Sequence, residues 1–165
     1  MSPEHENARA HGDADDRLEL DRFVPYRLAV LADWVSRSLA RTYQHRFGIT
    51  IPEWRILANL AREEPLSAGE LSERANLEKP RVSRALQRMT RVGLIDREPS
   101  VADQRVAVIR MSGKGRDLYR QIEPLALSWE QEMLSGLSGA ERIALDQLLD
   151  RLGEQLERMH GRNTG

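Results

Sequence analysis

The sequence contains no cysteine, few aromatic residues and no long apolar run. The absence of cysteine excludes disulfide bonds, thiol redox sensing and thiolate metal sites. Aromatic residues make up only 5% of the chain, so a core has to be built mostly from Leu, Ile, Val, Ala and Met. No apolar stretch approaches the roughly 18 residues of a membrane span, and no secretory signal is visible at the N-terminus. We therefore expect a cytoplasmic protein with no membrane partner.

Catalytic and metal-binding patterns are also missing from the sequence. It shows no Ser/His/Asp nucleophile arrangement, no phosphate loop and no cluster of metal ligands. The histidines are scattered and lack the paired spacing of a zinc site; they are His5, His11, His45 and His160. We predict a protein that is not an enzyme and that needs neither a metal ion nor a cofactor.

Positive charge is concentrated in one segment of the chain. The whole chain has 25 basic and 26 acidic residues. Residues 76–116 contain ten Lys or Arg against four acids, so this segment carries +6 and the remainder −7. A near-neutral protein that gathers its positive charge in one segment is suited to binding an anion, and the leading candidate is nucleic acid.

Apolar periodicity, capping boxes and helix-ending glycines predict six helices. The expected ranges are about 25–47, 50–62, 67–74, 78–92, 113–134 and 138–159. Short strands are expected at 94–98 and 106–111, joined by a polar loop. The predicted fold class is mainly α with a small β-hairpin wing (α+β). Residues 1–20 are polar and net acidic, which predicts a flexible tail.

The helix expected at 78–92 has two opposite faces when its residues are placed at about 100° intervals. Apolar side chains occupy one face, and the other is almost wholly basic. The only acid in this helix is Glu78, so charge pairing along the helix does not explain the basic face. Such a helix, presented through a tight turn, can enter a DNA major groove. The early residues Lys79, Arg81, Ser83 and Arg84 are expected to point deepest, with the basic ones reaching guanine edges or phosphate. Ser83 and Gln87 read base edges more weakly, and Arg88 and Arg91 hold backbone phosphates.

Several short motifs in this region occur together: LSERA at 71–75, EKPRVSR at 78–84, GLIDR at 93–97, DQR at 103–105 and MSGKG at 111–115. In this combination the chain resembles the MarR-type winged helix-turn-helix regulators over about residues 20–158. Many members carry small hydroxyl residues where this chain has Pro80 and Arg81.

The resemblance implies a 21–158 domain built around a winged helix-turn-helix domain at about 50–112. Its helix-turn-helix would span 67–92 and its wing 94–111. It further implies an obligate homodimer joined by helices at about 25–47 and 113–159. Asp103 would orient the wing or brace a recognition-helix arginine, and Arg105 would lie in the minor groove. Ser67, at the start of the helix-turn-helix, is also assigned to double-stranded DNA.

Dimerisation is also expected from the residues themselves. The helices at 25–47, 113–134 and 138–159 carry more apolar surface than a small winged domain can cover. A two-fold dimer of this kind reads a pseudo-palindrome with half-sites about one helical turn apart.

Members of this family typically repress transcription until a small aromatic or anionic molecule enters a cleft beside the winged domain. Aromatic side chains next to arginines suit a planar body with a carboxylate or phosphate, such as an aromatic acid or its CoA thioester. The residues assigned to this site are Trp34, Arg37, Ser38, Arg41, Tyr43, His45, Arg46, Trp54 and Arg55. In the alternative interpretation, the two tryptophans are core residues and the arginines are solvated.

Two functions remain open at this level. The first is a homodimeric, effector-released repressor of a pseudo-palindromic operator, with a possible role in aromatic catabolism. The alternative is a ligand-independent or architectural DNA-binding protein, which would lack an effector cleft and discriminate weakly between DNA sequences.

Overall fold

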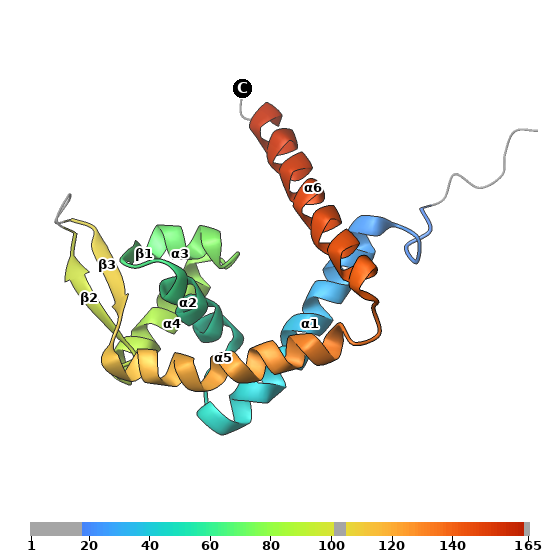
Figure 1. Cartoon of the computed structure of the whole chain (residues 1–165). Helices are drawn as coiled ribbons and strands as arrows, with labels where there is room; N and C mark the ends of the chain where they lie inside the picture. Colours follow the sequence, from blue (N-terminus) through green and yellow to red (C-terminus); the bar gives the residue numbers. More distant parts are fainter. Residues whose placement is uncertain (1–17, 101–104, 164–165) are drawn as a thin grey trace, which may run out of the picture. The chain divides into compact units, whose positions relative to one another are not determined.

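Helices make up most of the chain, and they accompany one small antiparallel sheet (Figure 1). The computed structural model describes residues 18–100 and 105–163. Its elements are α1 (Val24–Phe47), α2 (Ile51–Arg62), β1 (Leu66–Ser67), α3 (Ala68–Arg74), α4 (Lys79–Arg91), β2 (Ile95–Pro99), β3 (Ala107–Met111), α5 (Gly113–Met133) and α6 (Gly139–Asn163). The predicted fold class, mainly α with a β-hairpin wing, is confirmed. Residues 1–17 of the predicted tail lie outside the described residues.

Local capping signals determine where the helices begin. At the start of α2 the backbone N–H of Thr50 donates to the Glu53 carboxylate at 2.7 Å. At the start of α3 the backbone N–H of Ser67 donates to Glu70 at 2.7 Å, and Glu70 returns a bond to the Ser67 hydroxyl at 3.2 Å. These reciprocal bonds satisfy N–H groups that a helix end otherwise leaves unpaired. Gly48 follows α1 with a φ of 65°, a left-handed conformation that glycine adopts without strain.

The sheet has three strands in the order β1-β3-β2, where the sequence predicts a two-stranded ribbon. In the antiparallel β2–β3 pair, Ile95 lies opposite Met111 and Pro99 opposite Ala107. The additional strand, β1, places Leu66 opposite Ile109. A two-residue strand is too short to show a periodic pattern in the sequence. The third strand therefore corrects the prediction of a two-stranded ribbon. It fastens the start of the helix-turn-helix to the wing.

The core lies among α2, α3, α4, the sheet and the first part of α5, with the end of α1 packed against it. Apart from Tyr43 and Glu53, its largest fully buried side chains are aliphatic or methionine, as the low aromatic content requires: Ile56, Leu57, Leu60, Leu66, Leu71, Leu86, Met89, Ile95, Ile109 and Ile122.

Gly115, in the first turn of α5, is one of the most closely packed backbone positions. A Cβ atom at this position would lie 2.1 Å from the carbonyl oxygen of Leu94 and 2.8 Å from the Cγ atom of Met111. Only a residue without a side chain allows α5 to approach the entrance of β2 this closely.

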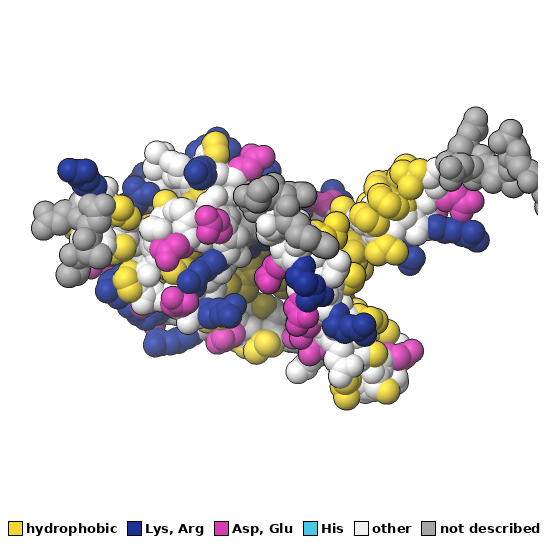
Figure 2. Space-filling view, turned by 90° about the horizontal axis from the view of Figure 1, so that it is seen from above, with side chains coloured by type: hydrophobic (Ala, Val, Ile, Leu, Met, Phe, Trp, Pro, Cys, Tyr) yellow, Lys and Arg dark blue, Asp and Glu magenta, His cyan; other side chains and the backbone are white. Residues whose placement is uncertain are grey.

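The chain divides into two units, Met1–Ser36 and Arg37–Gly165, with the boundary inside α1. In the first unit, Leu28, Leu31 and Trp34 are exposed, and Figure 2 shows a run of apolar side chains on this first part of α1. In the second unit, α6 exposes the residues that fall near heptad spacing in the sequence; these are Ile143, Leu145, Leu148, Leu149, Leu152 and Leu156. None of the helices in residues 18–100 and 105–163 is both long enough and apolar enough to cross a membrane.

Candidate nucleic-acid interface

A tight turn presents α4 after α3. Asn76 has a φ of 49°, and the Ser72 hydroxyl donates to the carbonyl oxygen of Leu77 at 2.6 Å. Glu78 is the N-cap of α4, and Pro80 occupies its first turn, where a missing N–H costs nothing. The turn therefore ends one helix and begins the next within a few residues, as the sequence predicts.

The two faces of α4 are separated as expected. Val82, Ala85, Leu86 and Met89 are buried, and the helix packs against α2, α3 and β2. Val92, expected on the same apolar face, is instead the C-cap residue and is exposed, because the helix ends before it. The polar residues on the solvent side are Lys79, Arg81, Ser83, Arg84, Gln87 and Arg91. This arrangement leaves a row of cationic side chains on one side of an anchored helix.

Arg88 differs from the other arginines of α4. Its Nη1 atom donates to both oxygens of the Glu53 carboxylate, and its Nη2 atom donates to the Gly48 carbonyl at 2.9 Å. Its guanidinium thus already holds an acid and a carbonyl of its own chain, and the assignment of Arg88 to phosphate stays a prediction. The acid partner, Glu53, lies 35 residues away and outside α4.

Glu53, the acid partner of Arg88, is not among the residues expected from the sequence to take part in the site. Its side chain is 1% exposed, and it also accepts a bond from the Thr50 hydroxyl at 3.0 Å. The capping box accounts for an acid at this position on local grounds, so the sequence carries no separate signal for the partner on α4. A carboxylate this buried is stable only when it is paired and hydrogen-bonded.

The wing carries further charges. Arg110 on β3 pairs with Glu98 on β2 at 3.5 Å, which fastens the two strands through their side chains as well as their backbones. Arg105 is exposed at the edge of the described part of the wing. Asp103 lies outside the described residues, so its predicted role stays a prediction. Ser67 is half-buried, and its hydroxyl caps α3 while its assignment to DNA also stays a prediction.

Among the residues assigned to an effector, Tyr43 belongs to the core and Trp54 packs against it. Tyr43 is 1% exposed; its ring centroid lies 5.5 Å from that of Trp54, which stacks on Tyr119 at 5.7 Å. Burial raises the pKa of Tyr43 to about 12, against the opposing effect of Arg55. Arg55 donates to the carbonyl of Ala75 at 3.2 Å. Tyr43 is thus a core residue and Trp54 packs against the core, while their assignment to an effector stays a prediction.

The other assigned residues are distributed along α1. Trp34 belongs to the first unit, where it is 63% exposed, so the core interpretation does not hold for it within this chain. Arg46 lies over the ring of Phe47, with its Cζ atom 5.2 Å from the centroid. In the second unit, Arg37, Ser38, Arg41 and His45 are exposed.

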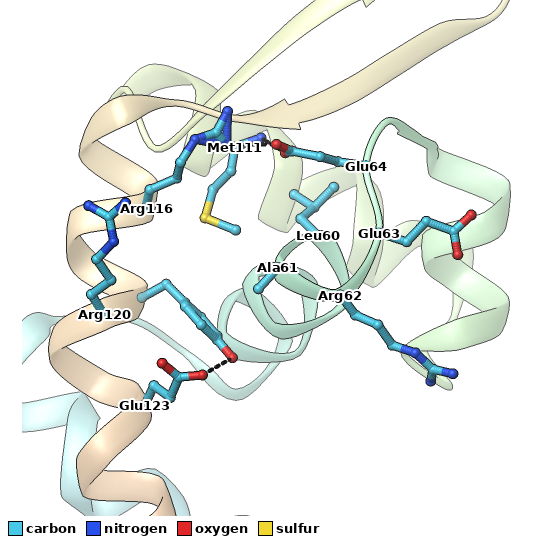
Figure 3. Close-up of a pocket in the computed structure, with 10 residues that line it drawn as sticks. Leu60, Ala61, Arg62, Glu63, Glu64, Met111, Arg116, Arg120 and Glu123 are labelled. Atoms are coloured by element: carbon cyan, nitrogen blue, oxygen red, sulfur yellow. Dashed lines mark hydrogen bonds and ion pairs between the residues drawn. The ribbon is translucent and has the colours of Figure 1, made fainter.

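A pocket of about 610 Å³ lies between the end of α2 and α5 (Figure 3), and Tyr119 is one of the residues that line it. Leu60 and Ala61 reach it from α2, while Arg116, Arg120 and Glu123 come from α5. Six of its ten lining residues are charged, and both signs are present. Such a lining suits a small molecule that carries charged or polar groups.

Three hydrogen bonds join residues that line this pocket. Glu64 accepts the backbone N–H of Met111 and the Arg116 guanidinium, each at 2.7 Å. The Tyr119 hydroxyl donates to Glu123 at 3.1 Å, and burial together with this carboxylate raises the pKa of Tyr119. The ring that borders the pocket is therefore fixed on one side by Trp54 and at its hydroxyl by Glu123.

Comparison with known proteins identifies similar sequences and folds. Residues 47–106 match the family described as the MarR family. The transcriptional repressor IacR of Pseudomonas putida is 25% identical over 156 residues, which cover 94% of this chain and 93% of the relative. The family match covers the helix-turn-helix and β2 and ends just before β3.

Solved structures have the same fold. A MarR/EmrR family regulator from Acinetobacter sp. ADP1 is 26% identical, with a TM-score of 0.77 over 86% of this chain and 99% of that one. BpsR of Bordetella bronchiseptica, whose DNA binding is regulated by 6-hydroxynicotinic acid, is 20% identical with a TM-score of 0.73 over 83% and 97%. At that identity the likeness to BpsR concerns the fold alone.

Proposed function

We propose that this chain, which belongs to the MarR family of transcriptional regulators, is a homodimeric repressor of a pseudo-palindromic operator. A small aromatic or anionic effector releases it from the DNA. The observation that carries the proposal is the cationic side of α4, whose opposite side is buried in the core. A helix anchored in this way can enter a major groove without moving against the rest of its domain.

In the proposed complex, the first turns of α4 lie deepest in the groove. Arg81 and Arg84 reach guanine edges or phosphate, and Ser83 and Gln87 contact base edges more weakly. Arg91 holds a backbone phosphate, and Arg105 enters the adjacent minor groove, where a narrow groove concentrates negative potential. These contacts assign DNA binding to residues 50–112.

The proposed dimer joins the helices at about 25–47 and 113–159 of two chains. Its support is the apolar surface that α6 and the first part of α1 expose, including Leu148 and Leu149 at 53% each. Apolar surface of this extent on a water-soluble chain marks an interaction site. An isologous pair would present two α4 helices to successive major grooves.

The experiment that tests this function starts from a duplex selected by the protein from a random-sequence pool. Gel shifts with the selected duplex and a scrambled duplex, over a salt series, give affinity, discrimination and salt slope. With six to ten phosphate contacts, affinity should fall by roughly 10³ to 10⁵ between 50 and 200 mM salt. Discrimination of about 10³ or more supports the operator-specific repressor. Similar affinity for both duplexes supports the architectural alternative, and no binding in dilute buffer rejects both.

The effector is expected to bind the pocket between α2 and α5 and to stabilise the folded chain. At a ligand concentration 100 times its Kd, binding adds about 2.7 kcal/mol to the free energy of unfolding. For a domain of this size that corresponds to a rise in melting temperature of roughly 5–10 °C. A thermal-shift panel of aromatic acids, beginning with 6-hydroxynicotinic acid, and their CoA esters measures this, and any hit should also abolish the gel shift. A panel with neither effect favours the ligand-independent alternative.

Replacing Arg105 by alanine should weaken DNA binding and leave the dimer intact. The side chain contributes charge to a groove rather than packing to the core, so the salt slope should fall by about one for each wing. Gel shifts over a salt series measure the slope, and light scattering measures the oligomeric state. A variant that loses the dimer would show that residue 105 acts in folding and not in the wing.

A further inference from the structure

Arg88 connects three segments that are distant in the sequence. It lies on α4, its acid partner Glu53 lies in the first turn of α2, and its carbonyl partner Gly48 ends α1. These partners are 35 and 40 residues away from it. Residues 48–53, which lead from the end of α1 into the first turn of α2, form the α1–α2 corner. A single guanidinium thus contacts both ends of this corner.

The acceptors of Arg88 are themselves held in place. One oxygen of Glu53 accepts the backbone N–H of Thr50 at 2.7 Å, which fixes the carboxylate to the start of α2. Gly48, which holds the other acceptor, has a left-handed backbone that directly follows α1. The planar fork of an arginine can bridge two such acceptors at once, whereas a lysine ammonium acts as a point charge.

We infer that Arg88 is a positioning residue. It sets the angle of α4, the proposed recognition helix, relative to the α1–α2 corner. Through this angle it sets how much more tightly the protein binds its operator than other DNA sequences. The inference rests on the proposed DNA-binding function. Arg88 is four residues from Arg84, or about 6 Å along the helix. A tilt of α4 at Arg88 displaces the base-reading first turns, and hydrogen bonds to base edges weaken steeply when their angles fall off.

A positioning arginine and a phosphate-binding arginine differ in a measurable way. Each neutralised phosphate contributes about 0.9 to the slope of log affinity against log salt. An arginine already paired with Glu53 releases no counterion, so its loss leaves the slope unchanged. It lowers affinity for the correct sequence more than for a scrambled one, because only the correct sequence depends on the angle of the helix.

The test compares Arg88→Gln with the control Arg91→Gln, one turn further along the exposed side of α4. The probes are the duplex selected by the wild-type chain and its scrambled counterpart. Arg88→Gln should lower the ratio of the two affinities at least tenfold with an unchanged salt slope. Arg91→Gln should reduce the slope by about two per dimer and leave the ratio unchanged. A reduced slope for Arg88→Gln would overturn the inference.

Glu53→Gln gives a result of opposite sign under the two interpretations. If Arg88 bound phosphate, removing the competing carboxylate would strengthen binding to both duplexes. If Arg88 positions α4, the ratio of affinities should fall as it does for Arg88→Gln. Glu53→Gln and Arg88→Lys also decide the question should Arg88→Gln fail to fold: the lysine should keep the slope and lose the discrimination.

Melting temperatures and circular dichroism of each variant separate positioning from simple stabilisation. A lowered melting temperature with an unchanged ratio of affinities would mean that Arg88 only supports the fold, and would overturn the inference. A wild-type chain that binds no selected duplex would instead refute the proposed function itself.

Discussion

Replacing Gly115 by alanine is expected to destabilise the fold by about 3 kcal/mol or more, the upper end of what overpacking costs. The added Cβ atom would lie 2.1 Å from the Leu94 carbonyl oxygen. That oxygen cannot simply move away, since it accepts the backbone N–H of Ser112 at 3.0 Å. Urea unfolding measures the change, and the melting temperature should fall by roughly 6–12 °C.

Gly113→Ala is the matched control, in the same turn of α5 and two residues earlier. A Cβ atom there meets nothing within 4 Å. An alanine at such a position stabilises by about 0.4–1 kcal/mol, because it reduces the freedom of the unfolded chain. Equal stabilities of the two variants, measured at one protein concentration, would contradict the close approach of α5 to the β2 entrance.

Arg84→Ala is expected to cost about 1–3 kcal/mol of operator binding for each recognition helix that contacts a base edge. Because the side chain is exposed and lies on the solvent side of α4, the fold should keep its stability. Gel shifts with the selected duplex measure the loss, and a second selection with the variant should show relaxed sequence preference at one position of each half-site.

A charge-matched control for Arg84→Ala is Arg22→Ala, before the start of α1, which removes an equal charge outside the proposed DNA contacts and outside the helices assigned to the dimer. It should leave operator affinity nearly unchanged. Should both variants weaken binding equally, the effect would come from net charge. Unchanged affinity of Arg84→Ala would remove this residue from the recognition set.

The helices could be predicted from the sequence because their signals are local. The capping acids Glu53 and Glu70, three residues after their partners, and Gly48 mark ends that the structure reproduces. The strand β1 could not be predicted, because a two-residue segment acquires its pairing only from β3, which is more than 40 residues away. Sequence patterns predict local elements, but they do not predict a strand pair between segments that are distant in the sequence.

The distinction between local and long-range signals also explains which features of the candidate site could be predicted from the sequence. Burial along α4 follows from helical spacing, so its two faces were predictable. The ion pair between Arg88 and Glu53 joins two separate helices, and the residue pattern of neither helix predicts it. The residues of an effector site are hard to predict for a related reason: a tryptophan at helical spacing looks the same in the sequence whether it faces a ligand or, like Trp54, another ring.

The exposed apolar side of α6 has a consequence for how the protein responds to its own concentration. If that side is covered only when two copies meet, mass action makes folding stability depend on how much of the chain is present. Thermal unfolding should then occur at higher temperature as the protein is concentrated. Operator occupancy would rise more steeply than linearly with expression, so that a modest change in synthesis rate would switch the regulated promoter across a threshold.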